Sequence, residues 1–475
     1  MIFKPQKYNI KDESMVDFID PEEINDYLDR AKPTTEMVRQ VILKSLNKER
    51  LNLEEVALLV KATDPEQIEM IKEGAKTLKR NVYGNRIVLF APLYVGNLCN
   101  NNCKYCGFRA SNSNAERKTL NDQELHENVV ALEQNGQKRL ILVFGEHQKY
   151  NAQYIADTVR KVYAIRSGNG EIRRVNINAA PMEIEDFKTV KESGIGTYQI
   201  FQETYHPEAY KKYHLSGKKA DFNYRITSLD RAMEAGIDDV GIGVLFGLYD
   251  WKYEVLALVR HTNHLEACYN IGPHTLSFPR LQKALNLDVD DRYLVSDEEF
   301  TRIIAILRLA VPYTGMILTA RETAEIRREV LQYGCSQIDA GTKIEIGAYA
   351  EKFQKNQELK KEQFQINDNR SLNDVIEELI DQDYLPSFCT ACYRLGRTGE
   401  HFMEFSVPGF IKRYCSSNAL LTLAEYLMDY APPKTAERGW TLIEKSMLDL
   451  EGFQDIDEVH ARLQRIKNGE RDLYF

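Results

Sequence analysis

Three closely spaced cysteines are the part of this sequence best suited to chemistry. Cys99, Cys103 and Cys106 lie within eight residues, after an apolar run that ends at Val95. Thiolates are soft ligands that suit iron–sulfur clusters, zinc and Cu(I), whereas a closed zinc site normally takes four protein ligands. A Cys-x3-Cys-x2-Cys loop can hold three irons of a [4Fe-4S] cluster and leave the fourth open to a small molecule. The spacing therefore favours a cluster over half of a zinc site.

A second cysteine group lies much further along the chain. Cys389, Cys392 and Cys415 again supply three thiolates, and no fourth cysteine is left to complete the set. A structural zinc ion there would need His401 or another histidine as its fourth ligand. A second, incompletely ligated iron–sulfur cluster is the favoured interpretation.

Composition and charge narrow the class of protein. The 475 residues, 43% of them hydrophobic, can bury a substantial core. The net charge of -9 argues against a bias towards nucleic acid or anionic membranes. Eight cysteines are too few for a disulfide scaffold in so long a chain. Because the sequence shows no signal-peptide pattern and no apolar run of about 18 residues, we expect a cytoplasmic protein without a membrane segment.

The cysteine loops must be positioned by the elements around them. From Ile87 onwards short β-rich runs alternate with helical patterns, which is typical of repeated βα units and a parallel sheet. Eight such units predict an α/β fold, a complete (β/α)8 TIM barrel, with reactive groups on the loops after the strands. The first cysteine loop follows the first strand and so belongs to that face. The predicted strands are 87–93, 139–144, 173–178, 197–201, 239–244, 273–278, 314–318 and 337–340.

Helical patterns divide the chain into three parts. Between the strands we predict helices at 122–135, 183–193 and 221–235, each followed by a glycine, and a capping box that starts at Ser296. The charged run 351–365 predicts a solvated helix. The predicted parts are a helical N-terminal extension (1–85), the barrel (86–341) and a mainly helical C-terminal iron–sulfur domain (342–475).

The first cysteine loop resembles that of the radical S-adenosylmethionine (SAM) superfamily, because Tyr105 stands just before the last cysteine. Strand two ends in Gly145-Glu146, where glycine permits close backbone approach and a carboxylate can accept hydrogen bonds from an ammonium group. The resemblance implies that this pair binds the methionyl amino group of SAM. It also implies that the Cys99, Cys103 and Cys106 site carries a [4Fe-4S] cluster.

Three further positions match SAM contacts of the superfamily. Glu203 ends strand four, where a carboxylate can accept both hydroxyls of a ribose. Arg225 lies in a segment similar to that of biotin synthase, in which an arginine pairs with the SAM carboxylate; bidentate pairing suits arginine. Gly243, in strand five, fits a backbone that lies against an adenine ring, although glycine there can also relieve packing.

The loops after strands six and seven resemble the aromatic amino acid lyases of the same superfamily. Thr319-Ala320-Arg321-Glu322 is similar to an element whose arginine binds the carboxylate of the amino acid substrate. The resemblance implies that role for Arg321. Arg280, in the segment 277–281, is a second candidate for the substrate pocket.

The second cysteine group, with its surrounding segment 409–413, resembles the [FeFe]-hydrogenase maturation tyrosine lyases. That family implies cleavage of L-tyrosine at Cα–Cβ to p-cresol and dehydroglycine, and conversion of the latter to CO and cyanide. It implies an auxiliary [4Fe-4S]-type cluster at Cys389, Cys392 and Cys415 with an extra iron held by a histidine. The helix after strand five offers two candidates for this ligand, His261 and His264, and we favour His264. A ferredoxin or flavodoxin and other hydrogenase maturation proteins are the implied partners.

Two alternatives remain at this point. The tyrosine lyase of thiamine thiazole biosynthesis, a 2-iminoacetate synthase, shares the barrel and the first half of the reaction but lacks the second cysteine group. A non-catalytic iron–sulfur carrier or scaffold would use both cysteine groups but leave Glu146, Glu203 and Arg321 without a role. In the favoured interpretation the two clusters lie at opposite ends of the barrel, and its interior must be open enough to pass a small fragment.

Overall fold

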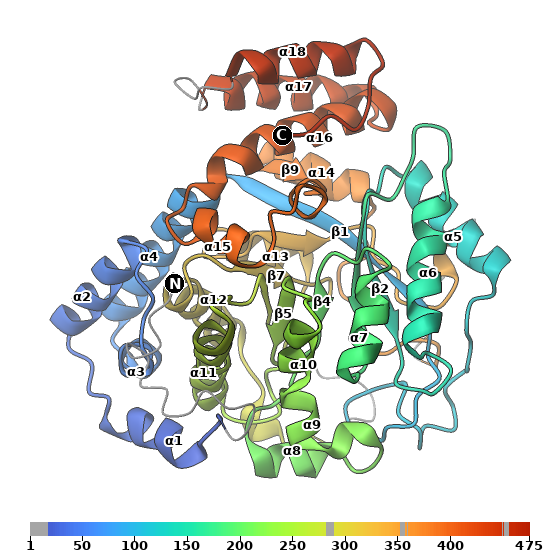
Figure 1. The fold of residues 1–475 in the computed structure, drawn as a ribbon. Coiled ribbons are helices and arrows are strands. Elements are labelled where there is room, and N and C mark those ends of the chain that lie inside the picture. The colour runs from blue at the N-terminus through green and yellow to red at the C-terminus, as the bar shows by residue number, and fades with distance from the viewer. Residues whose placement is uncertain (1–17, 282–288, 352–356, 359, 449, 451–455) are drawn as a thin grey trace.

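Eight parallel strands close into a barrel, as the sequence predicts (Figure 1). The computed structural model describes residues 18–475 except 282–288, 352–356, 359, 449 and 451–455, so the first 17 residues of the predicted N-terminal extension lie outside the described part. Strand β1 pairs with both β2 and β8, which closes the barrel. The strands are β1 (Arg86–Gly96), β2 (Arg139–Phe144), β3 (Arg174–Asn178), β4 (Tyr198–Gln199), β5 (Val240–Gly243), β6 (Thr275–Ser277), β7 (Gly315–Leu318) and β8 (Gln337–Asp339).

The barrel helices surround the sheet as expected, with one difference. The predicted helix 221–235 is two helices, because the Thr227 hydroxyl donates back to the Asn223 carbonyl at the break. The capping box at Ser296 is confirmed by its exchange of hydrogen bonds with Glu299. The helices are α5 (Asp122–Gln134), α6 (Ala152–Ala164), α7 (Ile184–Lys191), α8 (Pro207–Tyr213), α9 (Phe222–Ile226), α10 (Ser228–Glu234), α11 (Trp251–Tyr269), α12 (Asp297–Ala310) and α13 (Ala324–Leu331).

The N-terminal helices pack on one side of the barrel. They are α1 (Pro21–Arg30), α2 (Thr35–Leu46), α3 (Leu53–Lys61) and α4 (Pro65–Tyr83), and they contact α11 and α12. Arg50, which is buried in this interface, donates to the Glu266 carboxylate of α11 at 2.8 Å. The extension therefore packs on the outer helices of the barrel.

A ninth strand, which the sequence analysis did not predict, joins the C-terminal region to the barrel. Strand β9 (Leu385–Ser387) pairs in parallel with the first three residues of β1. The remaining helices are α14 (Leu372–Asp381), α15 (Gly399–Ser406), α16 (Ile411–Asp429), α17 (Pro433–Leu448) and α18 (Ile456–Lys467). In Figure 1 the helices α16 to α18 lie at the opposite end of the barrel from α8 and α9.

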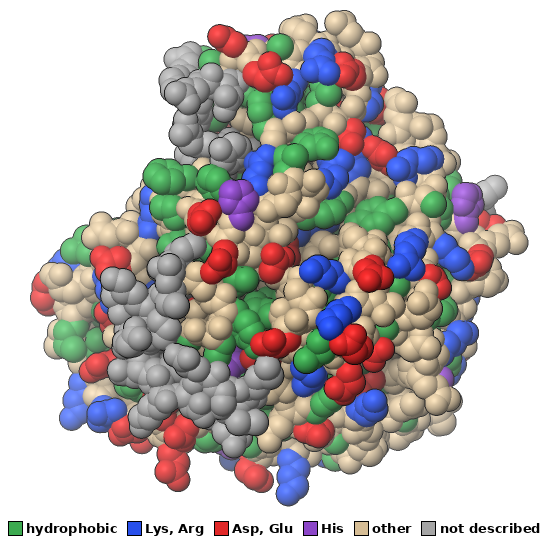
Figure 2. Space-filling view, viewed as in Figure 1, with side chains coloured by type: hydrophobic (Ala, Val, Ile, Leu, Met, Phe, Trp, Pro, Cys, Tyr) green, Lys and Arg blue, Asp and Glu red, His purple; other side chains and the backbone are tan. Residues whose placement is uncertain are grey.

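The surface in Figure 2 carries charged side chains of both signs. On the face shown in Figure 2, acidic and basic side chains are interspersed and do not form a broad field of one sign. Among the described residues, no helix has the length and hydrophobicity needed to cross a membrane.

Candidate functional site

The first cysteine loop opens into a cavity at the C-terminal ends of the strands. Cys99, Cys103 and Cys106 all line it, and Cys103 is only 5% exposed. Burial raises the pKa of Cys103 to about 12, so the thiolate that a metal requires must be stabilised by the metal's own charge. Each cysteine of a [4Fe-4S] cluster binds a different iron. The three thiols line the same cavity, and they therefore fit three of the four irons of such a cluster.

Tyr105 is fixed by a hydrogen bond that runs behind the cysteine loop. The Nδ1 atom of His214 lies 2.8 Å from the Tyr210 carbonyl, to which it must donate, so its Nε2 accepts from the Tyr105 hydroxyl at 2.7 Å. This tautomer requires a neutral ring, and burial lowers the pKa of His214 well below its ordinary value. The bond anchors the residue between Cys103 and Cys106 to α8.

The charged run 351–365 does not form the solvated helix that we expected. Its described residues are not helical, and residues 352–356 and 359 lie outside the described part. Gln363 instead lines the first cavity, where it donates to the Cys106 sulfur at 3.7 Å and accepts from the Tyr94 hydroxyl at 2.9 Å. Phe364 lines the cavity beside it. The sequence analysis missed these two uncharged residues because the many charged residues around them made the whole run look solvent-exposed.

Gly145 and Glu146 both line the first cavity. A Cβ on Gly145 would come within 2.2 Å of the Leu98 carbonyl oxygen, so only glycine permits this approach of β2 to the cysteine loop. The Glu146 Oε2 atom accepts from the Asn101 amide at 2.7 Å, while its buried Oε1 has no partner among the described residues. A buried carboxylate oxygen that faces a cavity without a donor fits the ammonium group of SAM.

Glu203 belongs to a small ionic cluster on the same cavity wall. Its carboxylate lies 2.7 Å from the Lys219 ammonium and 3.8 Å from the Arg225 guanidinium. Burial alone would raise the pKa of Glu203, but these two cations lower it below its ordinary value. The carboxylate is therefore ionised and can accept hydroxyl donors, while Arg225 is further held by the Phe201 carbonyl at 2.9 Å.

The backbone at Glu203 is strained, and Glu254 of α11 holds it. Glu203 has φ of +70°, a left-handed conformation that residues with a Cβ rarely adopt. The next two residues contact the Glu254 carboxyl group: the Thr204 hydroxyl hydrogen-bonds to one oxygen and the Tyr205 N–H donates to the other at 2.8 Å. Burial raises the pKa of Glu254 to about 8.

Glu254→Gln is expected to remove a pH dependence of stability. Between pH 4.5 and 8 the folded protein keeps a proton that the unfolded chain loses, so this group's stabilising contribution falls as pH rises and is lost above pH 8. The slope is at most about 1.4 kcal/mol per pH unit. Glutamine mimics the protonated acid, since its carbonyl can accept from Tyr205 and its amide can donate to Thr204. Anaerobic thermal melts at pH 6.5 and 8.5 test this, and an unchanged difference between the two pH values would contradict it.

The two candidate substrate arginines lie in different surroundings. Arg321 lines the first cavity, with its guanidinium 3.4 Å from the centre of the Phe364 ring. Arg280 does not line the cavity: it forms a bidentate ion pair with Glu322 and a second ion pair with Asp297. Arg280 therefore holds the loop next to Arg321, because a guanidinium whose donors are already satisfied is not available to a substrate.

The surroundings of Gly243 favour the second interpretation given above, in which glycine relieves packing inside the barrel. It does not line the first cavity, and a Cβ there would lie 2.6 Å from both the Phe201 ring and the Ser277 carbonyl oxygen. The close approach is therefore between β5 and its neighbours in the barrel.

The second cysteine group lies at the other end of the barrel. Cys389, Cys392 and Cys415 line a small cavity together with Arg86 and Arg174, which stand at the N-terminal ends of β1 and β3. A hydrogen bond between Cys392 and Cys415 lowers the pKa of the Cys415 thiol, and Arg86 adds to that effect. Strand β1, roughly 33 Å long at 3.3 Å per residue, begins at this cavity with Arg86 and ends at Gly96, just before the first cysteine loop.

The cavities at the two ends of the barrel are lined by different residues, with no lining residue in common. Phe90, Ile141 and Ile317 form an apolar cluster and line the first cavity.

The histidine beside the second cysteine group is His274, which the sequence analysis did not consider. His274 lines the cavity just before β6, and burial lowers the pKa of its ring to about 4, so the ring is neutral, as a metal ligand must be. The predicted ligand His264 lies elsewhere, fully buried with its Nε2 2.6 Å from Asp230 and its ring stacked on Phe18. His261 bonds to the Tyr205 hydroxyl at 2.8 Å.

The failure of the His264 prediction has a geometric cause. Helix α11 packs on the outside of the barrel, and the side chains of its C-terminal half point towards α10 and the N-terminal extension. His274, which directly precedes β6, instead lines the cavity at the barrel mouth. Its position at the N-terminal end of the predicted strand 273–278 was the signal that could have found it.

Comparisons with known proteins agree with this architecture. Residues 93–260 match the radical SAM superfamily, and residues 277–385 match the biotin and thiamin synthesis associated domain. The chain is 30% identical to 2-iminoacetate synthase of Escherichia coli over 359 residues, which are 75% of this chain and 92% of that protein.

Two solved structures share nearly the whole chain. A structure of HydG, described as a maturase of the [FeFe]-hydrogenase, has a TM-score of 0.92 and 46% identity and covers 97% of this chain and 100% of that one. HydG of Carboxydothermus hydrogenoformans has a TM-score of 0.79 and 36% identity and covers 94% of this chain and 100% of that one. The chain therefore belongs to the radical SAM superfamily and, within it, to the family of the HydG maturases.

Proposed function

We propose that this protein cleaves L-tyrosine at Cα–Cβ to p-cresol and dehydroglycine at the first site, and converts the latter to CO and cyanide at the second. The products serve assembly of the [FeFe]-hydrogenase active-site cluster. The observation that carries the proposal is the pair of three-cysteine sites at the two ends of one barrel, joined by β1. A single site would suffice for tyrosine cleavage alone.

The residues of the first site would hold SAM and the substrate. When bound, the cluster and SAM supply a carbon-centred radical that takes a hydrogen atom from tyrosine. Glu146 offers its unpartnered oxygen to the methionyl ammonium group, and Glu203 offers an ionised carboxylate to the ribose hydroxyls. Arg225 and Arg321 both line the cavity, where Arg225 would pair with the SAM carboxylate and Arg321 with the carboxylate of tyrosine.

The apolar part of the first cavity would keep water away from the reacting groups. Phe90, Ile141 and Ile317 exclude water from the side of the cavity that faces the barrel interior. Exclusion of water protects a reactive intermediate from side reactions. An electron donor of the ferredoxin or flavodoxin type, and other hydrogenase maturation proteins, are the partners that this function requires.

At the second site, Cys389, Cys392 and Cys415 would hold an auxiliary [4Fe-4S]-type cluster, and His274 would hold its extra iron. The donor set fits, because three thiolates leave one cluster corner open and a neutral imidazole faces the same cavity. Arg86 and Arg174 place positive charge beside the thiolates.

His274→Ala and His264→Ala are expected to behave in opposite ways. The first should lower iron content by about one iron per chain, because the remaining cluster keeps its three cysteines. The second should keep the iron but destabilise the fold by about 2 kcal/mol, because Asp230 loses a buried hydrogen-bond partner. Anaerobic iron analysis and thermal melts separate the two. Loss of the extra iron in His264→Ala alone would restore the original assignment.

The reaction itself is tested with reconstituted, reduced protein, SAM and tyrosine. We expect 5′-deoxyadenosine, p-cresol, CO and cyanide. Formation of p-cresol without CO, in protein whose second cluster is shown to be loaded, would favour the 2-iminoacetate synthase reaction, which the 30% identity to that enzyme also makes a candidate. Absence of SAM cleavage would favour a carrier or scaffold.

A further inference from the structure

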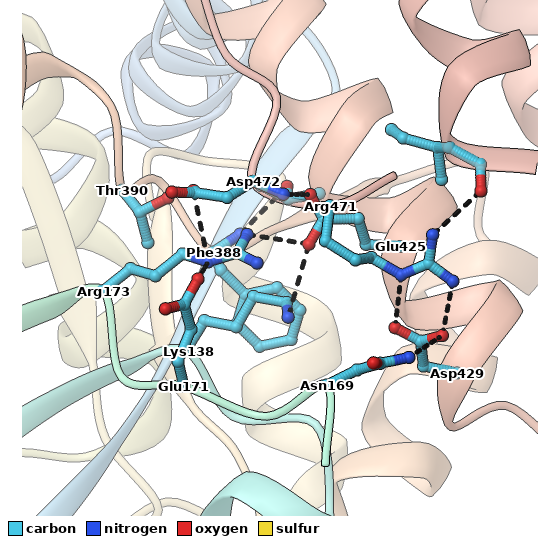
Figure 3. Close-up of polar contacts among 12 residues, drawn as sticks. Lys138, Asn169, Glu171, Arg173, Phe388, Thr390, Glu425, Asp429, Arg471 and Asp472 are labelled. Atoms are coloured by element: carbon cyan, nitrogen blue, oxygen red, sulfur yellow. Dashed lines mark hydrogen bonds and ion pairs between the residues drawn. The ribbon is translucent and has the colours of Figure 1, made fainter. Parts of the chain in front are cut away.

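The segment after α18 ties together the elements that carry the second cysteine group. Asp472 is its central residue (Figure 3), and its side chain accepts two hydrogen bonds from Arg394, at 2.7 and 2.9 Å. The same carboxylate lies 3.2 Å from Arg173, at the base of the barrel. Its backbone N–H donates to Glu425 of α16 at 2.8 Å. One residue therefore bridges a loop, a helix and the barrel.

The bridges to Arg394 and to Glu425 lead to cysteines of the second group. Arg394 lies in the turn that begins at Cys392, and its Nε donates to the Thr390 carbonyl at 2.7 Å, next to Cys389. Helix α16 carries both Cys415 and Glu425. The contacts of Asp472 thus fix the Cys389–Cys392 loop relative to the helix that supplies the third thiolate.

A buried ionic cluster anchors this arrangement to the barrel. Glu425 is fully buried and accepts from Arg173 at 2.7 Å, with the Lys138 ammonium at 3.4 Å (Figure 3). Lys138 and Arg173 lie at or beside the N-terminal ends of β2 and β3. Arg173 also pairs with Glu171 at 2.7 Å, and Asp472 adds a further carboxylate to this cluster, in which a buried charge needs a partner of opposite sign.

The neighbours of Asp472 hold the segment itself in place. Arg471 forms a bidentate ion pair with Asp429 at the end of α16, and Phe475 exchanges two hydrogen bonds with Asn418, one turn beyond Cys415. Asp472 has φ of +57°, a left-handed conformation that Asp adopts at lower cost than most residues. The conformation directs its carboxylate to Arg394 and its N–H to Glu425 at once.

We propose that the segment 471–475 is a strap that positions the second cysteine group, with Asp472 as the positioning residue that sets the Cys389–Cys392 loop against α16. The proposal rests on the proposed function only in that the second cysteine group holds a cluster. Without the Asp472 carboxylate, Arg394 keeps its contact with the Tyr474 ring, 4.1 Å away, but loses both hydrogen bonds that fix the loop carrying two of the three thiolates to the strap.

Asp472→Asn tests the strap in the full-length, reconstituted protein. Asparagine tolerates the same left-handed backbone and keeps the N–H donor, so the change isolates the ion pairs with Arg394 and Arg173. Under limiting iron we expect about threefold lower occupancy of the second cluster, an altered low-temperature electron paramagnetic resonance (EPR) signal from that cluster, and unchanged p-cresol formation. Glu470→Gln is the matched control, because Glu470 lies in the same segment but pairs with Arg465.

Two further comparisons decide the interpretation. Asp472→Glu should recover part of the EPR signal. Asp472→Asn combined with Arg394→Gln should lower occupancy by less than the two single effects added together, because both changes break the same Arg394–Asp472 ion pair. A second-cluster signal in Asp472→Asn identical to that of the wild-type protein would overturn the strap. Wild-type protein that never loads the second cluster would instead overturn the proposed function.

Discussion

Cys103→Ser is expected to reduce formation of 5′-deoxyadenosine and p-cresol to the background level. A serine hydroxyl keeps its proton at neutral pH and offers a hard oxygen in place of a soft thiolate, so it does not replace the iron ligand. Cys103 is the most buried of the three loop cysteines, and its backbone carbonyl accepts from the Cys106 N–H at 3.1 Å. The substitution removes one sulfur and leaves that backbone contact. Anaerobic product analysis and iron counting measure the effect, with a loss of about four irons per chain.

A cysteine outside both groups supplies the control for this experiment. Cys268 is half-buried on α11, where its sulfur lies 3.7 Å from His264. Cys268→Ser should retain both products and the full iron content. If Cys103→Ser still cleaved SAM, the assignment of the loop as the radical-generating site would be wrong.

Cys392→Ser is expected to separate the two halves of the reaction. Formation of p-cresol should continue at close to the wild-type rate, while CO and cyanide fall below detection. We expect this because the two sites are far apart. The two cysteine groups lie at opposite ends of β1, and their cavities have no lining residue in common. The loss of a thiolate at one end leaves the residues at the other end in place.

The measurement compares p-cresol by chromatography with CO trapped by a haem protein in the same reaction. EPR of the variant must show that the first cluster is retained. A parallel loss of p-cresol in protein that retains the first cluster would contradict the division of labour between the two ends of the barrel.

Much of the first site could be predicted from the sequence because its contacts follow the chain locally. The three cysteines lie within eight residues, and Gly145, Glu146 and Glu203 each lie within two residues of the end of a predicted strand. In a closed parallel barrel such positions meet at one face, so strand order suffices to bring them together. The strands predicted at 139–144 and 314–318 agree with β2 and β7 to within one residue.

The second site was harder to predict because its partners are distant in sequence. Cys389 and Cys415 meet His274 and Arg174 only because β9 pairs with the start of β1 and turns the C-terminal region across the barrel mouth. A three-residue strand gives no detectable alternation. His264 was preferred because hydrophobic pattern alone does not tell which side of α11 faces the barrel.

The sequence by itself therefore determined the cysteine spacing, the order of the barrel strands and the family, since these depend on residues near one another along the chain. Only the tertiary structure decided which histidine faces the second cysteine group, that Arg280 is held by Glu322 while Arg321 faces the cavity, and that Gln363 reaches the sulfur of Cys106. These contacts join residues far apart in sequence, and their geometry is set by closure of the barrel and packing of helices on it. Local periodicity carries no information about either.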